Sequence, residues 1–477
     1  MTGAAANTPG PDTPGPDTPG PDTPGPDTPA ALRLARHVAG LAFADLPPAA
    51  VAAAKTFLLD SLGVGIAGAT APGADRVRAA AARWGAGQEA ALWGTGARLP
   101  ASSAAFVNGF QLHGQEFDCV HEGAVLHPMA TLLPAALGWA EREGGITGTA
   151  FLTALAAGVD VAVALGLAAT GALRFFRPAT AGGFGAVAAT ARLAGFDATR
   201  IADAMGLLYA QTSGTMQPHI EASVALPLQP GFNARAALCA ADLAGAGLSG
   251  PHGAIDGPFG YLTLFEAGFD LAPVWAALAG ARRITELSHK PFPAGRATHG
   301  GIEGVAHLRA AHGFAPAEIA GVVVRAPPLI ARLCGRPAIA DPDPAYARLC
   351  MGFVIAKTLL EGALDPTHFR GPALRDPTTF ALARRVVTES DGTADPNALA
   401  PQEVTITLTD GRTLVWQAAT MLAHPSRPLS REAHLAKFRR CWSLAAIPLG
   451  APEALIEMVE DLEQLDDMRR LAALLGG

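Results

Sequence analysis

Acidic and basic side chains gather in one short stretch of an otherwise apolar chain, between positions 114 and 128. The stretch reads GQEFDCVHEGAVLHP and contains Glu116, Asp118, His121, Glu122 and His127. Half of the 477 residues are hydrophobic and only 16% are charged. Buried charges are costly unless they are paired or used. Any one of these acids could simply cap a helix, but the group as a whole indicates a site that moves protons.

His127 has the setting of a general base. Proline is favoured in the first helical turn, so Pro128 predicts a helix start with His127 at its N-cap. The positive end of the helix dipole disfavours an imidazolium there, which leaves a neutral imidazole that can accept a proton. Glu116 or Asp118 would orient this base or, if protonated, donate to a leaving hydroxyl. His121 is a second acid/base candidate.

The histidine spacing argues against a zinc hydrolase. His121 and His127 are six positions apart, whereas two ligands on one helical face are about four apart. We therefore predict no metal, and a loop-built site of histidine and carboxylate remains the alternative. The sequence has no G-x-S-x-G motif, and its GGFGA pattern follows no obvious strand, so neither a serine nucleophile nor dinucleotide binding is supported.

Helical periodicity dominates the chain from Pro29 to about residue 284. PPAAVAAAKTFLLDSLGVGIAGA starts with prolines and ends in glycine and alanine, and NARAALCAADLAGAGLSGP repeats apolar positions at three and four. This pattern predicts a large all-α domain over residues 30–284. Helical spacing returns after His424-Pro425, so residues 423–477 are expected to complete the same domain.

The spacing of the apolar residues changes from helical to strand-like near residue 285. AGVVVRAP and EVTITLTDGRTLVWQA are rich in β-branched residues, and Asp410-Gly411 in the second is a hairpin signal. The helix-like run YARLCMGFVIAKTLLEGAL lies between them. We predict a smaller inserted α+β lid domain over residues 285–422, within a mainly α fold. A domain inserted on two hinges can close over a cleft.

Composition narrows the function classes. Residues 8–27 repeat TPGPD four times, so residues 1–29 are predicted to form a disordered tail. The formal charge is -7, and four of the negative charges come from the tail aspartates, so neither nucleic acid nor an anionic membrane is expected as a partner. The apolar run FLTALAAGVDVAVALGLAATGALRFF contains Asp160 and is expected to be a buried helix rather than a membrane span. The five cysteines form no C-x-x-C pair and the start of the chain lacks a basic and apolar signal pattern, which indicates the cytoplasm.

Several stretches together resemble the MmgE/PrpD family. They are NGFQLHGQEFDCVHEGAVLHPMATLLPAALGWAE, FLLDSLGVGIAGA, RPATAGGFGAVAATARLAGFD, GFNARAALCAADLAGAGLSGP, HKPFPAGRATHGGIE and the stretch around HPSRPLSREAHLAKF. The resemblance implies an all-α domain with an inserted α+β lid, a homodimer, and cofactor-free chemistry on small di- or tricarboxylates in a cleft. Dehydratases, decarboxylases and epimerases all occur in this family.

The resemblance carries over unevenly to single residues. Family members read roughly H-x-x-D-F-D-D before H-P. Here Asp118 and His127 are kept, Glu116 replaces an aspartate, and Cys119 replaces an acid. In the lid motif K-x-F-P-x-H the lysine is Lys290, while the histidine becomes glycine. Three family groups that handle protons therefore lack equivalents, because Leu226 stands for a lysine, Gly295 for the histidine and Phe353 for a tyrosine.

An anionic substrate requires cations. Lys290, Arg296 and Arg177 could hold its carboxylates through charge-assisted hydrogen bonds, with His299 nearby. Arg177 could instead be a helix-end cation and His299 a core histidine. The sequence predicts a lyase of dehydratase type that acts on a small hydroxy- or unsaturated polycarboxylate. An isomerase or epimerase, a decarboxylase, and a polycarboxylate-binding protein without activity remain the alternatives.

Overall fold

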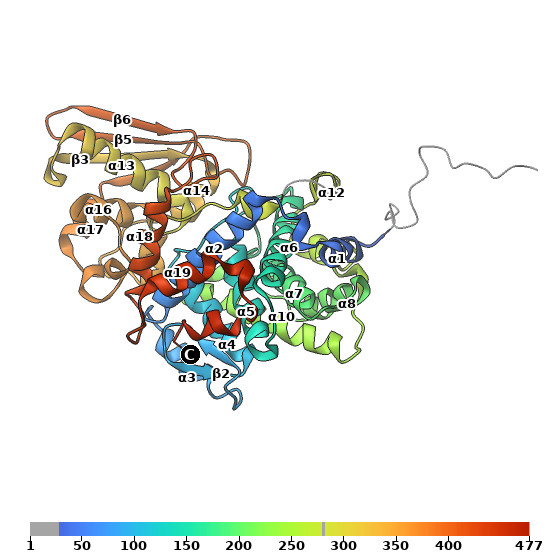
Figure 1. Cartoon of the computed structure of the whole chain (residues 1–477). Coiled ribbons are helices and arrows are strands. Elements are labelled where there is room, and N and C mark those ends of the chain that lie inside the picture. The colour runs from blue at the N-terminus through green and yellow to red at the C-terminus, as the bar shows by residue number, and fades with distance from the viewer. Residues whose placement is uncertain (1–27, 279–281, 477) are drawn as a thin grey trace, which may run out of the picture.

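The computed structural model describes residues 28–278 and 282–476 (Figure 1). Residues 1–27 of the predicted tail lie outside this part, so the tail stays a prediction. The helices before residue 279 are α1 (Ala30–Gly40), α2 (Pro48–Gly68), α3 (Ala74–Ala81), α4 (Ala101–His113), α5 (Pro128–Glu143), α6 (Gly148–Ala168), α7 (Thr180–Leu193), α8 (Ala198–Tyr209), α9 (Gln217–Glu221), α10 (Ala225–Gly245), α11 (Tyr261–Phe265) and α12 (Ala272–Leu278).

Mixed structure follows, and then a helical C-terminal segment. The later helices are α13 (His299–His312), α14 (Pro328–Cys334), α15 (Pro344–Arg348), α16 (Met351–Glu361), α17 (Pro377–Ala383), α18 (Arg431–Trp442), α19 (Pro452–Glu460) and α20 (Arg469–Ala473). Two short 3-10 helices matter for the site, η3 (Arg283–Glu286) and η4 (Arg296–Thr298). The strands of this part are β3 (Ile319–Ala326), β4 (Val386–Ser390), β5 (Gln402–Leu408) and β6 (Thr413–Ala418).

The four-stranded sheet has the order β4-β3-β5-β6. β3 runs parallel to β4 and antiparallel to β5, with Val322 opposite both Val386 and Ile406. β5 and β6 form the hairpin that Asp410-Gly411 predicts, and Gly411 supplies the required positive φ of 90°. Buried and more exposed residues alternate along β5, so one face of the sheet is buried against helices such as α13 and α16 (Figure 1).

The prediction of a mainly α fold with an all-α large domain is wrong. Residues 90–99 form a second, antiparallel sheet of β1 (Ala90–Leu92) and β2 (Ala97–Leu99), with Ala90 opposite Leu99. All three residues of β1 are buried, so the strand shows none of the alternation that marks a half-buried strand in a sequence. Gly94 and Gly96 both have positive φ in the connecting turn. The fold is a helix-rich mixture of helices and two sheets.

Buried apolar side chains separate into one large cluster and several smaller ones. The largest draws on residues 30–287 and again on 438–475, and α18 and α19 lie against α2, as the red and blue helices of Figure 1 show. A second cluster draws only on residues 297–421. This distribution agrees with an inserted unit, although the boundaries at 29, 284 and 422 stay predictions.

Two helices, α2 and α6, are long and apolar enough to cross a membrane by length and composition alone. In each, most of the apolar window is buried inside the molecule, 67% for α2 and 89% for α6. Core helices of folded proteins give the same signal. Asp160 of α6 accepts a hydrogen bond from the backbone N–H of Arg283 at 2.8 Å and pairs with His37 of α1 at 2.9 Å. Its charge therefore has partners within the fold.

Candidate active site

The loop between α4 and α5, residues 114–127, carries the predicted acid and base residues. Glu116 and Val125 adopt positive φ values of 49° and 50°, a strained conformation for residues with a side chain. Val120 and Ser288 exchange backbone hydrogen bonds of 3.0 and 2.8 Å, which fixes the loop to the segment that leads into the second unit. The loop is thus held in one shape by its neighbours.

Asp118 lies between two histidines. Its Oδ2 is 3.0 Å from Nδ1 of His113, with which it shares a hydrogen bond, and 3.2 Å from Nδ1 of His127. The His127 contact has the distance of an ion pair without the alignment of a hydrogen bond. The two imidazole rings meet edge to face, with centroids 5.0 Å apart. His127 is the N-cap of α5, as its place before Pro128 predicts.

Lys290 lies close to the carboxylates of Glu116 and Asp118. Its Nζ donates a hydrogen bond to Glu116 Oε2 at 2.8 Å and lies 3.8 Å from Asp118 Oδ1. Both Lys290 and Asp118 are fully buried. The ammonium group thus neutralises the acids and takes part in the site electrostatically.

The neighbouring charges shift the pKa values of His127 and His113 in opposite directions. Burial and the charge of Lys290 lower the pKa of His127, so its imidazole is neutral at physiological pH. Burial also opposes protonation of His113, but Asp118 and Glu116 outweigh it and raise the pKa of that imidazole. The pair offers a base and an acid that share one carboxylate.

The surroundings of both carboxylates favour their ionised forms. Burial would raise the pKa of Glu116, but Lys290 and the two histidines lower it to about 2. Asp118 is likewise buried, yet His127, His113 and Lys290 hold its pKa well below the usual value. Of the two roles that the sequence offers for Glu116 and Asp118, these shifts favour orienting the base over donating a proton.

Two hollows adjoin this cluster. The first has about 590 Å³ of unfilled space, with Glu116, His127, Gly295 and Arg296 among its walls. The second has about 1150 Å³, and His113, Glu116 and Arg348 are among its lining residues. Glu116 and Leu349 line both. His127 lines the first hollow and His113 the second, and Glu116 lies where the two hollows adjoin.

His121 is not directed at Asp118. Its Nδ1 accepts a hydrogen bond from the backbone N–H of Ala124 at 3.1 Å, and its Nε2 lies 2.9 Å from Glu286 Oε2. The Ala124 bond requires a bare Nδ1 and therefore places the proton on Nε2, toward Glu286. His121 closes the end of the loop onto η3 instead of facing the cleft.

Arg296 lines the first hollow, but its hydrogen-bond donors are engaged. Nε and Nη2 donate to Glu122 Oε1 at 3.0 and 2.7 Å, and Nη1 donates to the carbonyl oxygen of Leu422 at 2.8 Å. His299 lies beside it, with Nδ1 3.3 Å from Arg296 Nη1 and Nε2 3.1 Å from the carbonyl oxygen of Ala294. Burial and Arg296 hold the pKa of His299 well below the usual value, so it is a neutral core group.

Arg177 lies apart from the cluster and is paired with Glu266. Its Nε and Nη2 donate to the two oxygens of Glu266 at 3.0 and 2.9 Å, and both side chains are buried. Its Nη1 donates to the carbonyl oxygen of Ala124 at 3.3 Å. Arg177 thus contacts the site loop at Ala124, and its charge is paired with buried Glu266.

The three altered family positions lie around the cleft. Gly295 lines the first hollow, and a Cβ there would meet Leu349 Cδ2 at 2.7 Å. Leu226 lines the second hollow. Phe353 lines neither and packs on Phe369, with ring centroids 5.8 Å apart. Neither Gly295 nor Leu226 therefore offers a proton-handling group to the hollow that it lines.

Two functional candidates escaped the sequence-based prediction. The sequence taken alone favours a core role for His113, although its position at the end of α4, five residues before Asp118, is a signal. Arg348 carried no signal, because the helix-like run around it is broken in the structure between α15 and α16. Both residues are buried and both line the second hollow.

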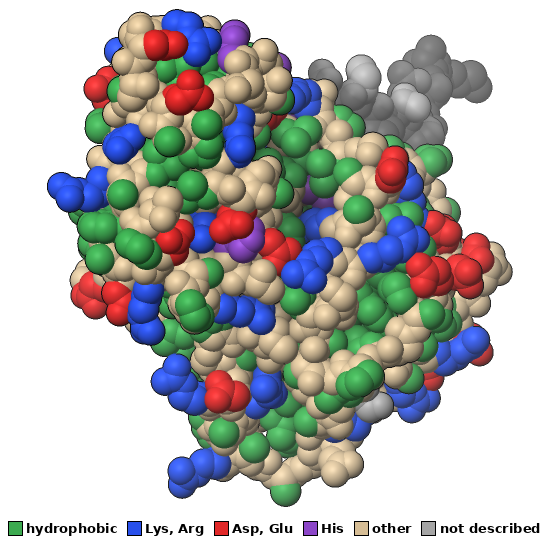
Figure 2. Space-filling model, turned by 90° about the vertical axis from the view of Figure 1, so that its left-hand side faces the viewer, with side chains coloured by type: hydrophobic (Ala, Val, Ile, Leu, Met, Phe, Trp, Pro, Cys, Tyr) green, Lys and Arg blue, Asp and Glu red, His purple; other side chains and the backbone are tan. Residues whose placement is uncertain are grey.

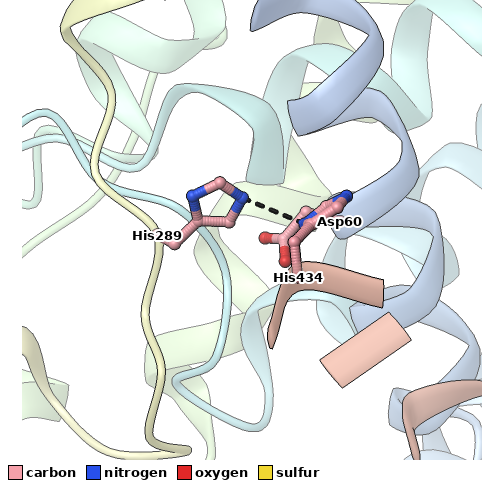
Figure 3. A group of neighbouring side chains, drawn as sticks. All are labelled: Asp60, His289 and His434. Carbon is pink, nitrogen blue, oxygen red and sulfur yellow. Dashed lines mark hydrogen bonds between the residues drawn. The ribbon is translucent and has the colours of Figure 1, made fainter. Parts of the chain in front are cut away.

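Two groups of side chains in the described residues could supply three metal ligands each. One is His113, Asp118 and His127; the other is Asp60, His289 and His434, whose ligand atoms lie within 4.8 Å of one another. Figure 3 shows His289 directed at His434, with His289 Nε2 and His434 Nδ1 3.1 Å apart. Lys437 Nζ lies 2.8 Å from Asp60 Oδ1, as Lys290 lies near Asp118. An ammonium group therefore already occupies the anionic side of each cluster.

The chain is similar to known proteins along most of its length. Residues 32–274 match the MmgE/PrpD N-terminal domain, and residues 292–464 match the MmgE/PrpD C-terminal domain. The chain is 28% identical to cis-aconitate decarboxylase of Homo sapiens over 455 residues, which cover 92% of each chain. It is also 28% identical to the mouse enzyme of that name over 457 residues, covering 92% of this chain and 91% of the relative. A cis-aconitate decarboxylase-like protein of Aspergillus oryzae is 26% identical, over 91% of this chain and 94% of the relative. The matches span nearly all of the described structure, and this chain belongs to the MmgE/PrpD family.

Proposed function

We propose that this chain is a cofactor-independent lyase of dehydratase type that acts on a small hydroxy- or unsaturated polycarboxylate. The observation that carries the proposal is the sharing of Asp118 by His113 and His127, whose pKa values are shifted in opposite directions. Pairs of titratable groups separated in this way supply the acid and the base of a reaction. The relatives named cis-aconitate decarboxylase support a polycarboxylate as the substrate class.

The reaction moves two protons and breaks one C–O bond. Nε2 of neutral His127 takes the proton from a carbon beside a carboxylate, and the C–H electrons form the new double bond as the hydroxyl leaves. Protonated His113 gives its Nε2 proton to that hydroxyl, which departs as water. Asp118 remains ionised throughout and stabilises each imidazolium in turn. Solvent then restores the proton of His113 and removes that of His127.

Decarboxylation is the second candidate, because the curated relatives carry that name. The proton-handling groups of the decarboxylase-like members are absent at Leu226, Gly295 and Phe353, which counts against plain decarboxylation. An isomerase or epimerase would use the same base without a leaving group. The homodimer and the cytoplasmic location that the sequence indicates stay predictions.

A panel of hydroxy- and unsaturated di- and tricarboxylates, incubated with the purified full-length chain, tests the proposal. Mass spectrometry distinguishes loss or gain of water from loss of CO₂, and incubation in D₂O reveals exchange without either. Water loss or addition supports the proposal, whereas CO₂ release alone or exchange alone would replace it with decarboxylation or epimerisation. Thermal stabilisation without turnover would leave a binding protein.

A further inference from the structure

The cations expected to hold the substrate are already paired. Lys290 donates to Glu116, Arg296 to Glu122 and Arg177 to Glu266. A polycarboxylate in the cleft needs at least one cation whose charge is not already neutralised by a neighbouring acid. A buried cation in the walls of the two hollows that has no close carboxylate partner would meet this need.

Arg348 is such a cation. It is 2% exposed, and the described residues form no ion pair with its guanidinium, on which Glu116 acts only from a greater distance. Its Nε has no hydrogen-bond partner there, and Nη2 makes a long contact of 3.5 Å to Gln115 Oε1. The guanidinium lies over the ring of Phe369, with Cζ 4.7 Å from the centroid. Glu116 itself is hydrogen-bonded to Lys290. Burial of a charge without a close counter-ion is costly, so an anion in the hollow would stabilise Arg348.

The fold holds this side chain in place. Arg348 is the last residue of α15, and Leu349 and Cys350 separate it from α16. Its carbonyl oxygen accepts a hydrogen bond from the backbone N–H of Gly295 at 3.0 Å. Burial and the nearby charge of Arg370 lower the pKa of Arg348 to about 9, which still leaves the guanidinium charged at neutral pH.

The surrounding space suits an anionic ligand. Arg348 lines the second hollow together with buried His113 and with Glu116 of the acid/base cluster. Arg76, Glu221 and Asp343 line the same hollow and are exposed, so its far end opens to solvent. Acidic and basic side chains are interspersed over the face that Figure 2 shows, so the surface charge there is mixed. Selectivity for an anion must then come from inside the hollow.

We propose that Arg348 binds a carboxylate group of the substrate through its guanidinium, on the His113 side of the cleft. A planar guanidinium matches a carboxylate with two parallel hydrogen bonds. The bound carboxylate would place the neighbouring carbon atoms near Glu116, where the two hollows adjoin. This inference rests on the proposed function, and it adds the group that anchors the substrate.

Three variants of the full-length chain test the role. Arg348→Met removes the charge and keeps much of the apolar stem, Arg348→Lys keeps the charge without the fork, and Arg375→Met is the control, since Arg375 forms an exposed pair with Asp341. We expect Arg348→Met to raise KM about 10- to 100-fold, the scale of a lost hydrogen bond to a charged group. Arg348→Lys should recover part of this loss, and Arg375→Met should leave KM unchanged.

Thermal melts separate binding from packing. Without ligand, Arg348→Met should melt at or above the wild-type temperature, because an unpaired buried charge is removed. Tricarballylate, a saturated tricarboxylate, should stabilise the wild-type chain and not Arg348→Met. A lowered melting temperature with KM and ligand stabilisation unchanged would assign Arg348 to packing and overturn the inference.

The same experiment distinguishes this inference from the proposed function. If wild type binds tricarballylate through Arg348 but turns over no member of the panel, the binding role holds and the lyase proposal fails. If turnover occurs and Arg348→Met retains wild-type KM and stabilisation, the lyase proposal holds and this inference fails. Absence of both turnover and stabilisation in the wild type would overturn both.

Discussion

Asp118 sets the chemistry of the residues around it. It is fully buried and reaches two imidazoles and an ammonium group within 4 Å. A carboxylate in that setting stays ionised. It therefore stabilises positive charge on whichever histidine holds the extra proton, without itself donating one.

His127→Asn tests the base at this scale. Asparagine retains an N-cap side chain before Pro128 but cannot accept a proton at the same position. We expect the variant to fold and its kcat to fall by about 100-fold or more, the usual contribution of a general base. His307→Asn, on the exposed face of α13, is the matched control and should retain full activity. Wild-type turnover in His127→Asn would remove the residue from the mechanism.

The pH dependence of kcat/KM follows from the two shifts. The proposed reaction needs neutral His127 and protonated His113. The first condition fails only below the lowered pKa of His127, and the second only above the raised pKa of His113. The profile should therefore be a bell whose limbs bracket the ordinary histidine pKa of 6.5, and its limbs belong to the coupled pair.

The His127→Asn variant is also the control for this profile. Its residual activity should lose the acidic limb and retain the basic one, because His113 is unchanged. An acidic limb that persists in the variant would assign that titration to another group.

The sequence allowed the acid/base cluster to be located, but not its division of roles. Crowding of acids and histidines in an apolar chain is visible without a structure, and Asp118 and His127 indeed adjoin. His113 could not be distinguished from a core histidine, because helix α4 buries its whole C-terminal half. The ion pairs of the two arginines were equally hidden. Arg177 pairs with Glu266, which is 89 positions away, and Arg296 pairs with Glu122, which is 174 positions away.

At the scale of elements, the loop of residues 114–127 is held by contacts from several directions. Arg296 of η4 binds Glu122, Glu286 of η3 binds His121, and Arg177 reaches the carbonyl oxygen of Ala124. The strained backbone at Glu116 requires such support. These residues therefore position the catalytic groups through the loop.

Arg296→Met tests this support. The Arg296 side chain is 3% exposed and that of Glu122 is 15% exposed. Removing one partner of a buried pair costs about 3–5 kcal/mol, because the other charge stays buried. We expect a clearly lowered melting temperature in a thermal scan and little change in KM, instead of the loss of substrate binding that the sequence suggested.

Arg375→Met provides the comparison, because its pair with Asp341 is exposed and should contribute less than about 1 kcal/mol. Glu122→Gln combined with Arg296→Met should recover part of the stability, since no unpaired charge remains. A large rise in KM with an unchanged melting temperature would show that Arg296 binds the substrate.

Element prediction succeeded where periodicity was strong. The long helices α2, α5 and α10, the strand β3 and the β5–β6 hairpin agree with the sequence pattern. It failed at the β1–β2 hairpin, whose short buried strands do not alternate, and at the break after Arg348. In both cases tertiary contacts override a weak local signal.

At the scale of the whole molecule, the C-terminal segment reaches the site loop through Lys437 of α18. Its Nζ lies 2.8 Å from Asp60 of α2 and donates a hydrogen bond to the carbonyl oxygen of Phe117 at 2.8 Å. His434 of the same helix meets His289, which precedes Lys290 (Figure 3). Three distant parts of the chain therefore join directly beside Asp118.

Lys437→Met tests that junction and its relation to metals. The ammonium group neutralises buried Asp60, so its loss should lower the melting temperature strongly, and adding Asp60→Asn to the same chain should restore part of it.

The single variant Lys437→Met also leaves Asp60, His289 and His434 without a competing cation, and these are ligand types that zinc accepts. We expect added Zn²⁺ to raise the melting temperature of Lys437→Met much more than that of the wild type, since binding to the folded state stabilises it. Adding His434→Ala to Lys437→Met should abolish the zinc effect. Equal stabilisation of wild type and Lys437→Met by Zn²⁺ would show that Lys437 does not occupy the anionic side of this cluster, and would make Asp60, His289 and His434 a metal site of the native chain.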